Sequence, residues 1–173
     1  MWIRGIALSL ALFACTSTAA YAADKIEGRR SDDPSSVAPD DPLFLIYVIP
    51  GVRDDGAIGN QGSATAIFCS NVSGSPQAIR VSVWHWGGTM VGTVTRPVNP
   101  ATTWTFSTHP TAAFADDALI NPANTVVDQG MAAVYATHKN IFCSAMTVDA
   151  SSDVPSGVAL HMVRKNPSVV SQE

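Results

Sequence analysis

Residues 77–95 read QAIRVSVWHWGGTMVGTVT, and this stretch decides the fold class. Its first half alternates apolar and polar side chains with a period of two, which is typical of a β-strand with one buried face. Gly87-Gly88 then provides a hairpin turn, and the alternation resumes over residues 89–95. The stretch therefore predicts two antiparallel strands. The side chains expected on the buried face are Ile79, Val81 and Val83.

The same pattern of short alternating runs continues along the chain. The runs are bounded by Gly, Pro, Asn, Asp and Ser, which favour turns, and Pro50-Gly51 and Pro97–Pro100 are expected to end their strands. About eight short strands at this spacing, with no amphipathic helix of three turns, predict an all-β domain: an antiparallel β-sandwich of the Ig-like or jelly-roll-like type. Residues 111–126 are ambiguous between a helical turn and a short edge strand. The expected strands are 43–49, 64–72, 77–86, 89–95, 102–108, 130–137, 140–148 and 157–164.

The N-terminus has the three parts of a secretory signal peptide. Arg4 supplies a positive charge, residues 6–14 (IALSLALFA) an apolar run, and Ala20-Tyr21-Ala22 the small residues that a signal peptidase reads. We expect cleavage after Ala22 and a secreted or periplasmic bacterial protein. An alternative is a lipid anchor on Cys15, since residues 12–15 (LFAC) look like a degenerate bacterial lipobox. No apolar run is long enough to predict a transmembrane span.

Composition divides the remaining chain. Residues 23–41 are rich in charge, Pro and Ser and contain no aromatic residue, which predicts a disordered leader. The β-sandwich domain is expected over residues 42–168, with a short tail over 169–173. The chain of 173 residues has a formal net charge of −4, and only 14% of its residues are charged. This acidic, charge-poor composition argues against a nucleic-acid partner.

Two cysteines, Cys69 and Cys143, remain after the predicted cleavage. Each lies in the tetrapeptide Ile-Phe-Cys-Ser, at residues 67–70 and 141–144. Two cysteines in an exported protein typically form one disulfide, and the shared local sequence indicates similar environments on two strands. We therefore predict a Cys69–Cys143 disulfide, with two separate buried thiols as the alternative.

No standard catalytic signature occurs in the chain: there is no G-x-S-x-G, H-E-x-x-H, P-loop or C-x-x-C motif. We expect no cofactor and no metal site, and an enzyme is not favoured. Asp54-Asp55 before Gly56 is typical of a turn, with calcium binding as an alternative, and Asp116-Asp117 is expected in a solvated loop. Histidines from separate loops could still converge on a metal. The four histidines, none at metal-ligand spacing, are His85, His109, His138 and His161.

The most distinctive local motif is Trp84-His85-Trp86. Alternation places Arg80, Trp84 and Trp86 on the face opposite the predicted core residues. Exposed aromatic side chains beside an arginine suit a protein interface or sugar stacking, so we predict that these three residues bind a ligand. The alternative is that the tryptophans belong to the core.

These observations favour an exported, non-enzymatic β-sandwich that acts as a binding, adhesion or structural module of the cell envelope or an extracellular assembly. Its expected partner is another protein or a second copy, engaged through a sheet edge or the aromatic face. A carbohydrate-binding module that uses the exposed tryptophans is one alternative. A small secreted metal-binding protein or hydrolase with convergent His and Asp residues is the other.

Overall fold

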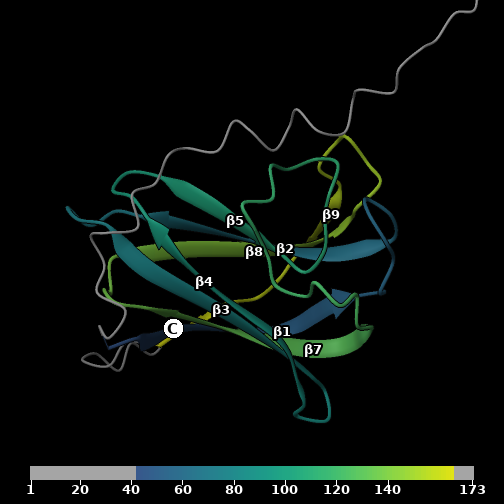
Figure 1. The fold of residues 1–173 in the computed structure, drawn as a ribbon, viewed down its shortest axis with the longest axis horizontal. Helices are drawn as coiled ribbons and strands as arrows, with labels where there is room; N and C mark the ends of the chain where they lie inside the picture. The colour runs from purple at the N-terminus through teal and green to yellow at the C-terminus, as the bar shows by residue number, and fades with distance from the viewer. Residues whose placement is uncertain (1–41, 166–173) are drawn as a thin grey trace, which may run out of the picture. The chain divides into compact units, whose positions relative to one another are not determined.

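Two five-stranded β-sheets make up the part of the chain that the computed structural model describes, residues 42–165 (Figure 1). The predicted signal peptide with Cys15, the leader and the C-terminal tail lie outside these residues. No helix occurs among the described residues, so none there has the length and apolar character needed to cross a membrane. The strands are β1 (Phe44–Asp54), β2 (Ser63–Asn71), β3 (Gln77–His85), β4 (Met90–Val98), β5 (Thr103–Ser107), β6 (Ala118–Leu119), β7 (Val127–Ala136), β8 (Ile141–Asp149), β9 (Gly157–Ala159) and β10 (Val163–Arg164).

The strand order confirms the predicted sandwich. Sheet A has the order β10-β1-β7-β3-β4, and sheet B has the order β6-β5-β2-β8-β9. Every strand pair is antiparallel except β5 and β6, which run parallel. A short turn joins the neighbouring antiparallel strands β3 and β4, as the Gly87-Gly88 signal predicted.

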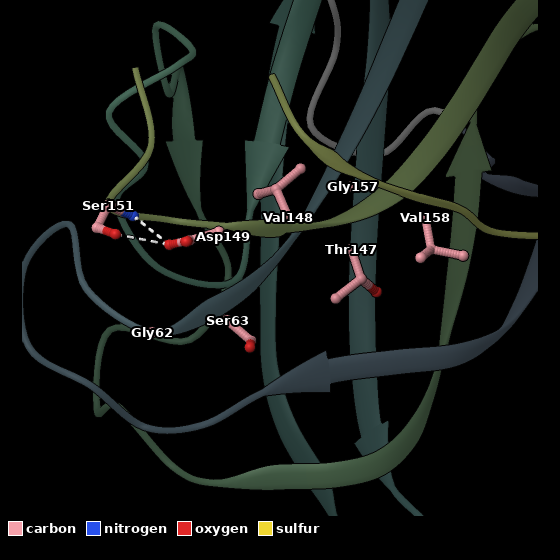
Figure 2. A pocket seen from close by; sticks show the side chains of 8 residues that line it. All are labelled: Gly62, Ser63, Thr147, Val148, Asp149, Ser151, Gly157 and Val158. Atoms are coloured by element: carbon pink, nitrogen blue, oxygen red, sulfur yellow. Dashed lines mark hydrogen bonds between the residues drawn. The ribbon is translucent and has the colours of Figure 1, made fainter. Parts of the chain in front are cut away.

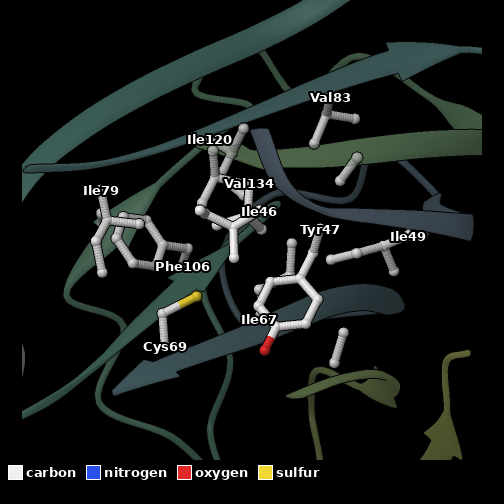
Figure 3. Packing of buried hydrophobic residues seen from close by; sticks show 14 of the residues in the cluster. Ile46, Tyr47, Ile49, Ile67, Cys69, Ile79, Val83, Phe106, Ile120 and Val134 are labelled. Atoms are coloured by element: carbon white, nitrogen blue, oxygen red, sulfur yellow. The ribbon is translucent and has the colours of Figure 1, made fainter. Parts of the chain in front are cut away.

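The core lies between the two sheets (Figure 3). Ile79, Val81 and Val83 of β3 are completely buried there, as the alternation predicted. Phe106 of β5 and Ile67 of β2 meet them from sheet B. Each such side chain contributes about 1.5–3 kcal/mol when it leaves water, so the period-two pattern is what holds the sheets together.

Residues 109–117 cover part of the outer face of sheet B. Phe114 from this segment packs edge-on against Phe68 of β2, with 4.8 Å between the ring centroids. The backbone N–H of Ala112 donates to the carbonyl of Ala150 at 2.8 Å. A second small cluster forms beneath the segment, whereas no such cluster lies on the outer face of sheet A within the described residues.

Cys69 and Cys143 lie directly opposite each other on the neighbouring strands β2 and β8, and they form a disulfide. Their Cα atoms are 4.2 Å apart, a separation typical of a non-hydrogen-bonded antiparallel pair. The bond joins positions 74 residues apart. The shared Ile-Phe-Cys-Ser tetrapeptides thus place the two cysteines at one level of sheet B.

Two strands run further than the sequence indicated. β1 continues through Pro50-Gly51, because Gly51 adopts φ = 80° at a register shift that bends the strand without ending it. β4 continues through Pro97 to Val98. Proline is tolerated there because β4 is an edge strand, so the position needs no N–H for a further neighbour.

The predicted strand over residues 157–164 is two strands in different sheets. β9 pairs with β8 in sheet B, whereas β10 pairs with β1 in sheet A. Leu160 and Met162 lie between them and pack against the core where the chain crosses from one sheet to the other. The ambiguous stretch 111–126 contains the short strand β6 and no helix.

Candidate functional site

Arg80 and Trp84 lie on the outer face of sheet A, but Trp86 does not share their strand. β3 ends at His85, and the backbone N–H of Gly88 donates to the His85 carbonyl at 2.9 Å to close a turn. Trp86 is a central residue of that turn and is 74% exposed. The prediction that Trp86 extends the stripe on the strand is therefore wrong, because Gly88 adopts φ = 83° and the turn takes up one residue more than a two-residue hairpin.

Trp84 belongs to an exposed row of side chains that runs across sheet A. It lies opposite Met90 of β4 and Met131 of β7, and Met131 lies opposite Pro50 of β1. Residues directly opposite in a sheet share a face, so these four residues form one line, here called the Trp84 row. Met90 is 55% exposed and Met131 39% exposed, while Trp84 is half-buried. Trp84 is thus neither a free surface residue nor part of the core cluster.

Two further rows lie beside it on the same face. Arg80 lies four residues before Trp84 on β3, about 13 Å along the strand, so the two belong to a broad face and not to one compact site. The second row is Thr93, Ser82, Ala133, Val48 and Val163, and the third is Thr95, Arg80, Tyr135 and Leu45. Arg80 is the one charged residue among the three rows.

The guanidinium of Arg80 is held by a hydrogen bond to the neighbouring strand β4. Its Nε donates to Oγ1 of Thr95 at 3.0 Å. Within residues 42–165 no carboxylate lies at ion-pair distance from this guanidinium. The one ion pair in this part of the chain is between His109 and Asp54. The arginine charge is therefore oriented but not neutralised by the described part of the chain.

A buried polar cluster, which the sequence did not reveal, fastens the loops at one end of the sandwich. Nδ1 of His109 lies 2.9 Å from Oδ1 of Asp54, and Nε2 of His109 lies 2.9 Å from the carbonyl oxygen of Gln61. Asn121 donates from Nδ2 to the other oxygen of Asp54 at 2.9 Å. The cluster thereby joins the end of β1 to the segments that follow β5 and β6.

Both ring nitrogens of His109 face oxygen acceptors, so both donate a proton and His109 is an imidazolium paired with the Asp54 carboxylate. Burial alone would lower the pKa of His109, but the hydrogen bond and charge of Asp54 outweigh it and raise that pKa. Burial alone would raise the pKa of Asp54, but the hydrogen bonds from His109, Asn121 and Gly56 outweigh it and lower that pKa.

This geometry leaves His109 without a free nitrogen for base catalysis. A general base needs a free nitrogen, and both nitrogens of His109 are engaged. Asp54, Asp55 and His109 are close enough to hold a metal, but the Asp55 oxygens accept from the backbone N–H groups of Ala57 and Ser63 at 3.2 and 2.8 Å. The expected turn role of the two aspartates is present. Within residues 42–165 no other histidine joins a group with ligand spacing.

Asp116 is not the solvated loop residue that the sequence suggested. It is half-buried and accepts a hydrogen bond from the hydroxyl of Ser107 and another from the backbone N–H of Thr111 at 2.6 Å. Burial raises the pKa of Asp116, although these hydrogen bonds oppose the shift. Asp117 accepts from the backbone N–H of Thr105 at 2.8 Å. Asp116 and Asp117 thereby attach residues 109–117 to β5.

A shallow, open depression of about 570 Å³ lies on sheet B (Figure 2). Asp149 is its one carboxylate, and it accepts from the backbone N–H and hydroxyl of Ser151 at 3.0 and 2.7 Å, which lowers the pKa of Asp149. No histidine and none of the predicted ligand-binding residues line it. The lining residues are Gly62, Ser63, Thr147, Val148, Asp149, Ser151, Gly157 and Val158.

Comparison with known proteins gives no relative to argue from. No protein-family model, no curated protein sequence and no solved structure matches this chain.

Proposed function

We propose that this protein is an exported, non-catalytic binding module of the cell envelope or an extracellular assembly, and that the outer face of sheet A docks a protein partner. The Trp84 row is the observation that carries the proposal. It places a tryptophan and two exposed methionines side by side across three strands.

The chemistry of this face suits a protein interface. The centre of such an interface is enriched in aromatic residues and methionine and contains few charges. Methionine adapts its shape to a partner, and tryptophan and arginine often dominate binding energy. The three rows hold Trp84 and Met131 in one row and a single charge, that of Arg80, in another.

The export part of the proposal rests on the sequence and on the cysteines. The N-terminal residues 1–22 have the order of charge, apolar run and cleavage site that marks a secretory signal. A disulfide between Cys69 and Cys143 is a bond that persists in an oxidising compartment. Both observations support a secreted or periplasmic location.

Carbohydrate binding is a second candidate, supported by Trp86. Its indole is 74% exposed at the tip of the β3–β4 turn, and the His85 ring centroid lies 5.6 Å away. An exposed aromatic ring of this kind can stack on a sugar. A glycan array probed with the wild-type protein and Trp86→Ala tests this candidate: it requires a wild-type signal that the substitution removes.

Site-specific photo-crosslinking in the cells that make the protein tests the main proposal. A photoreactive amino acid replaces Met90 or Met131, both exposed in the Trp84 row, in the full-length chain. Val154 and Val158, each 71% exposed and outside sheet A, serve as control positions. We expect one discrete protein adduct from the row positions and none from the controls. Equal adducts at all four positions, or none at the row, would contradict the proposal.

A further inference from the structure

β4 is an exposed edge of unusual length for this domain. It has nine residues, and among the strands of residues 42–165 it is hydrogen-bonded to β3 alone. The strands at the other three sheet edges, β10, β6 and β9, have two, two and three residues. Short edge strands limit pairing with other chains, and β4 is not protected in this way.

The backbone groups that β4 presents at its open edge follow from the hydrogen bonds of β3. The N–H of Ala78 donates to Oγ1 of Thr137, and the carbonyl of Ala78 accepts from the N–H of Thr137, both at 3.1 Å. Ala78 therefore points away from β4, so its partner Pro97 occupies a non-hydrogen-bonded position of the β3–β4 pair.

Such positions alternate along an antiparallel pair, so Thr93 and Thr95 also point their N–H and C=O groups away from β3. The Thr95 carbonyl accepts from Nη1 of Arg96 at 3.0 Å, as expected for a group directed to the open side. Pro97 has no N–H to offer. The open edge thus presents a donor and an acceptor on each of Thr93 and Thr95, and a pairing strand shares the Thr95 carbonyl with Arg96 or displaces it.

We propose that β4 pairs antiparallel with β4 of a second copy of this chain, about a two-fold axis at Val94. This register places Thr93 opposite Thr95 of the second copy, and Thr95 opposite Thr93. Both donor–acceptor pairs are then used, which gives four backbone hydrogen bonds, and Pro97 is not required as a donor.

The side chains fit the same register. Val94 packs against the core but is only partly buried, and it would meet Val94 of the second copy and complete its cover. Arg96 would lie opposite Gly92 of the second copy, so the two arginines stay apart. A two-fold axis at Thr95 would instead place the Arg80 side chains of both copies in one continuous row, because Arg80 lies opposite Thr95. That register would also pair Pro97 with Thr93 of the second copy, and Pro97 has no N–H to donate.

The pairing would affect how the protein binds its partner. The two-fold axis stands perpendicular to the joined sheet, so both Trp84 rows face the same side. A bivalent surface raises the effective affinity for a partner that presents two matching sites.

The dimer itself does not depend on the function proposed above. Its interface is small, so we expect weak, concentration-dependent association.

Cysteine trapping in the full chain tests the register. Under mild oxidation Val94→Cys should form a covalent dimer, because opposite residues of a non-hydrogen-bonded pair have Cα atoms about 4.5 Å apart. Thr93→Cys alone should not, because its two copies lie about 8 Å apart. An equal mixture of Thr93→Cys and Thr95→Cys should form a mixed dimer. Wild-type chain under the same conditions is the blank.

The control variant is Val158→Cys, which is 71% exposed on the edge strand β9. We expect Val94→Cys to dimerise about tenfold faster than this control, since pairing raises the local concentration. Equal rates, or a Thr93→Cys dimer that forms as fast as the mixed one, would overturn the proposal.

Sedimentation of the wild-type chain provides a second measurement. Its average mass should rise with concentration, and Thr93→Pro should prevent the rise because it removes an outward N–H while the β3–β4 bonds remain. A wild-type monomer at millimolar concentration would contradict the pairing. Adding Trp84→Ala to the Val94→Cys variant should leave its trapping unchanged, so a failed partner experiment and a failed dimer experiment are distinguishable.

Discussion

Nδ1 of His109 lies 2.9 Å from Oδ1 of Asp54, and both side chains are completely buried. This pair connects the end of β1 to the segment after β5, and the bond from Nε2 to the Gln61 carbonyl adds the β1–β2 loop. These hydrogen bonds join three segments that are far apart in the sequence.

Replacing His109 by alanine should destabilise the protein strongly. The substitution leaves the Asp54 carboxylate buried without its cation, a change that costs about 3–5 kcal/mol and lowers the melting temperature by on the order of 10 °C. Urea denaturation measures the loss. His161→Ala, at an exposed position, is the control and should change the free energy of unfolding by less than about 0.5 kcal/mol. Similar small effects for both variants would show that the pair is not structural.

The same pair should make stability depend on pH in both directions. The lowered pKa of Asp54 adds stability above the ordinary carboxyl pKa, and this is lost as the pH falls through the lower folded value. The raised pKa of His109 adds stability that is complete below about pH 6.5 and is lost as the pH rises through the higher folded value.

We therefore expect the free energy difference between wild type and His109→Gln to be largest from about pH 4 to 6.5 and to shrink on either side. Urea denaturation of both proteins across this range measures it. Burial raises the pKa of Asp116, and the charge of His109 opposes that shift. The substitution therefore raises the pKa of Asp116 further, which also makes the difference shrink as the pH falls. A difference that stays constant from acid to alkaline pH is the outcome that this account excludes.

The disulfide should contribute stability through the unfolded chain. Removing both sulfurs with Cys69→Ala and Cys143→Ala together should cost about 4 kcal/mol for a loop of 74 residues. Guanidinium denaturation of the double variant measures this, and the wild-type protein under reducing conditions is the matched comparison. An unchanged midpoint in both would contradict a structural disulfide.

Gly92 should not accept a side chain. A Cβ atom there would lie 1.9 Å from the backbone carbonyl oxygen of Ile120, so one of the two segments must move. We expect Gly92→Ala to destabilise by about 1–3 kcal/mol, as overpacking does. Gly74→Ala is the control, because nothing lies within 4 Å of the added atom. Thermal melting compares the two, and equal stability would show that β4 is not held against this segment.

The sandwich could be predicted from the sequence because its determinants are local. A period of two in the β3 region was enough to place Ile79, Val81 and Val83 in the core. The paired tetrapeptides likewise indicated the partner of Cys69. Strand ends were harder to predict. Pro50-Gly51 is a sequence that usually ends a strand, whereas β1 bends there at a register shift and stays in the sheet.

The site was only partly predictable, and the reason is sequence distance. His109 is 55 residues from Asp54, and Asn121 is 67 residues from it, so only the strand order brings these polar groups together. Trp86 was misplaced because a Gly-Gly pair is compatible with more than one hairpin turn. The Trp84 row could not be read from one strand, because Met90 and Met131 join Trp84 only through the register of neighbouring strands.

Trp84→Ala, measured in the photo-crosslinking experiment and by thermal melting in parallel, tests the central claim most directly. If the outer face of sheet A is the binding surface, the Met131 adduct disappears while the melting temperature falls by only a few degrees, since Trp84 is half-buried and outside the core cluster. An adduct that persists without the indole would contradict the claim. So would a drop in melting temperature of about 15 °C or more, because that would make Trp84 a core residue.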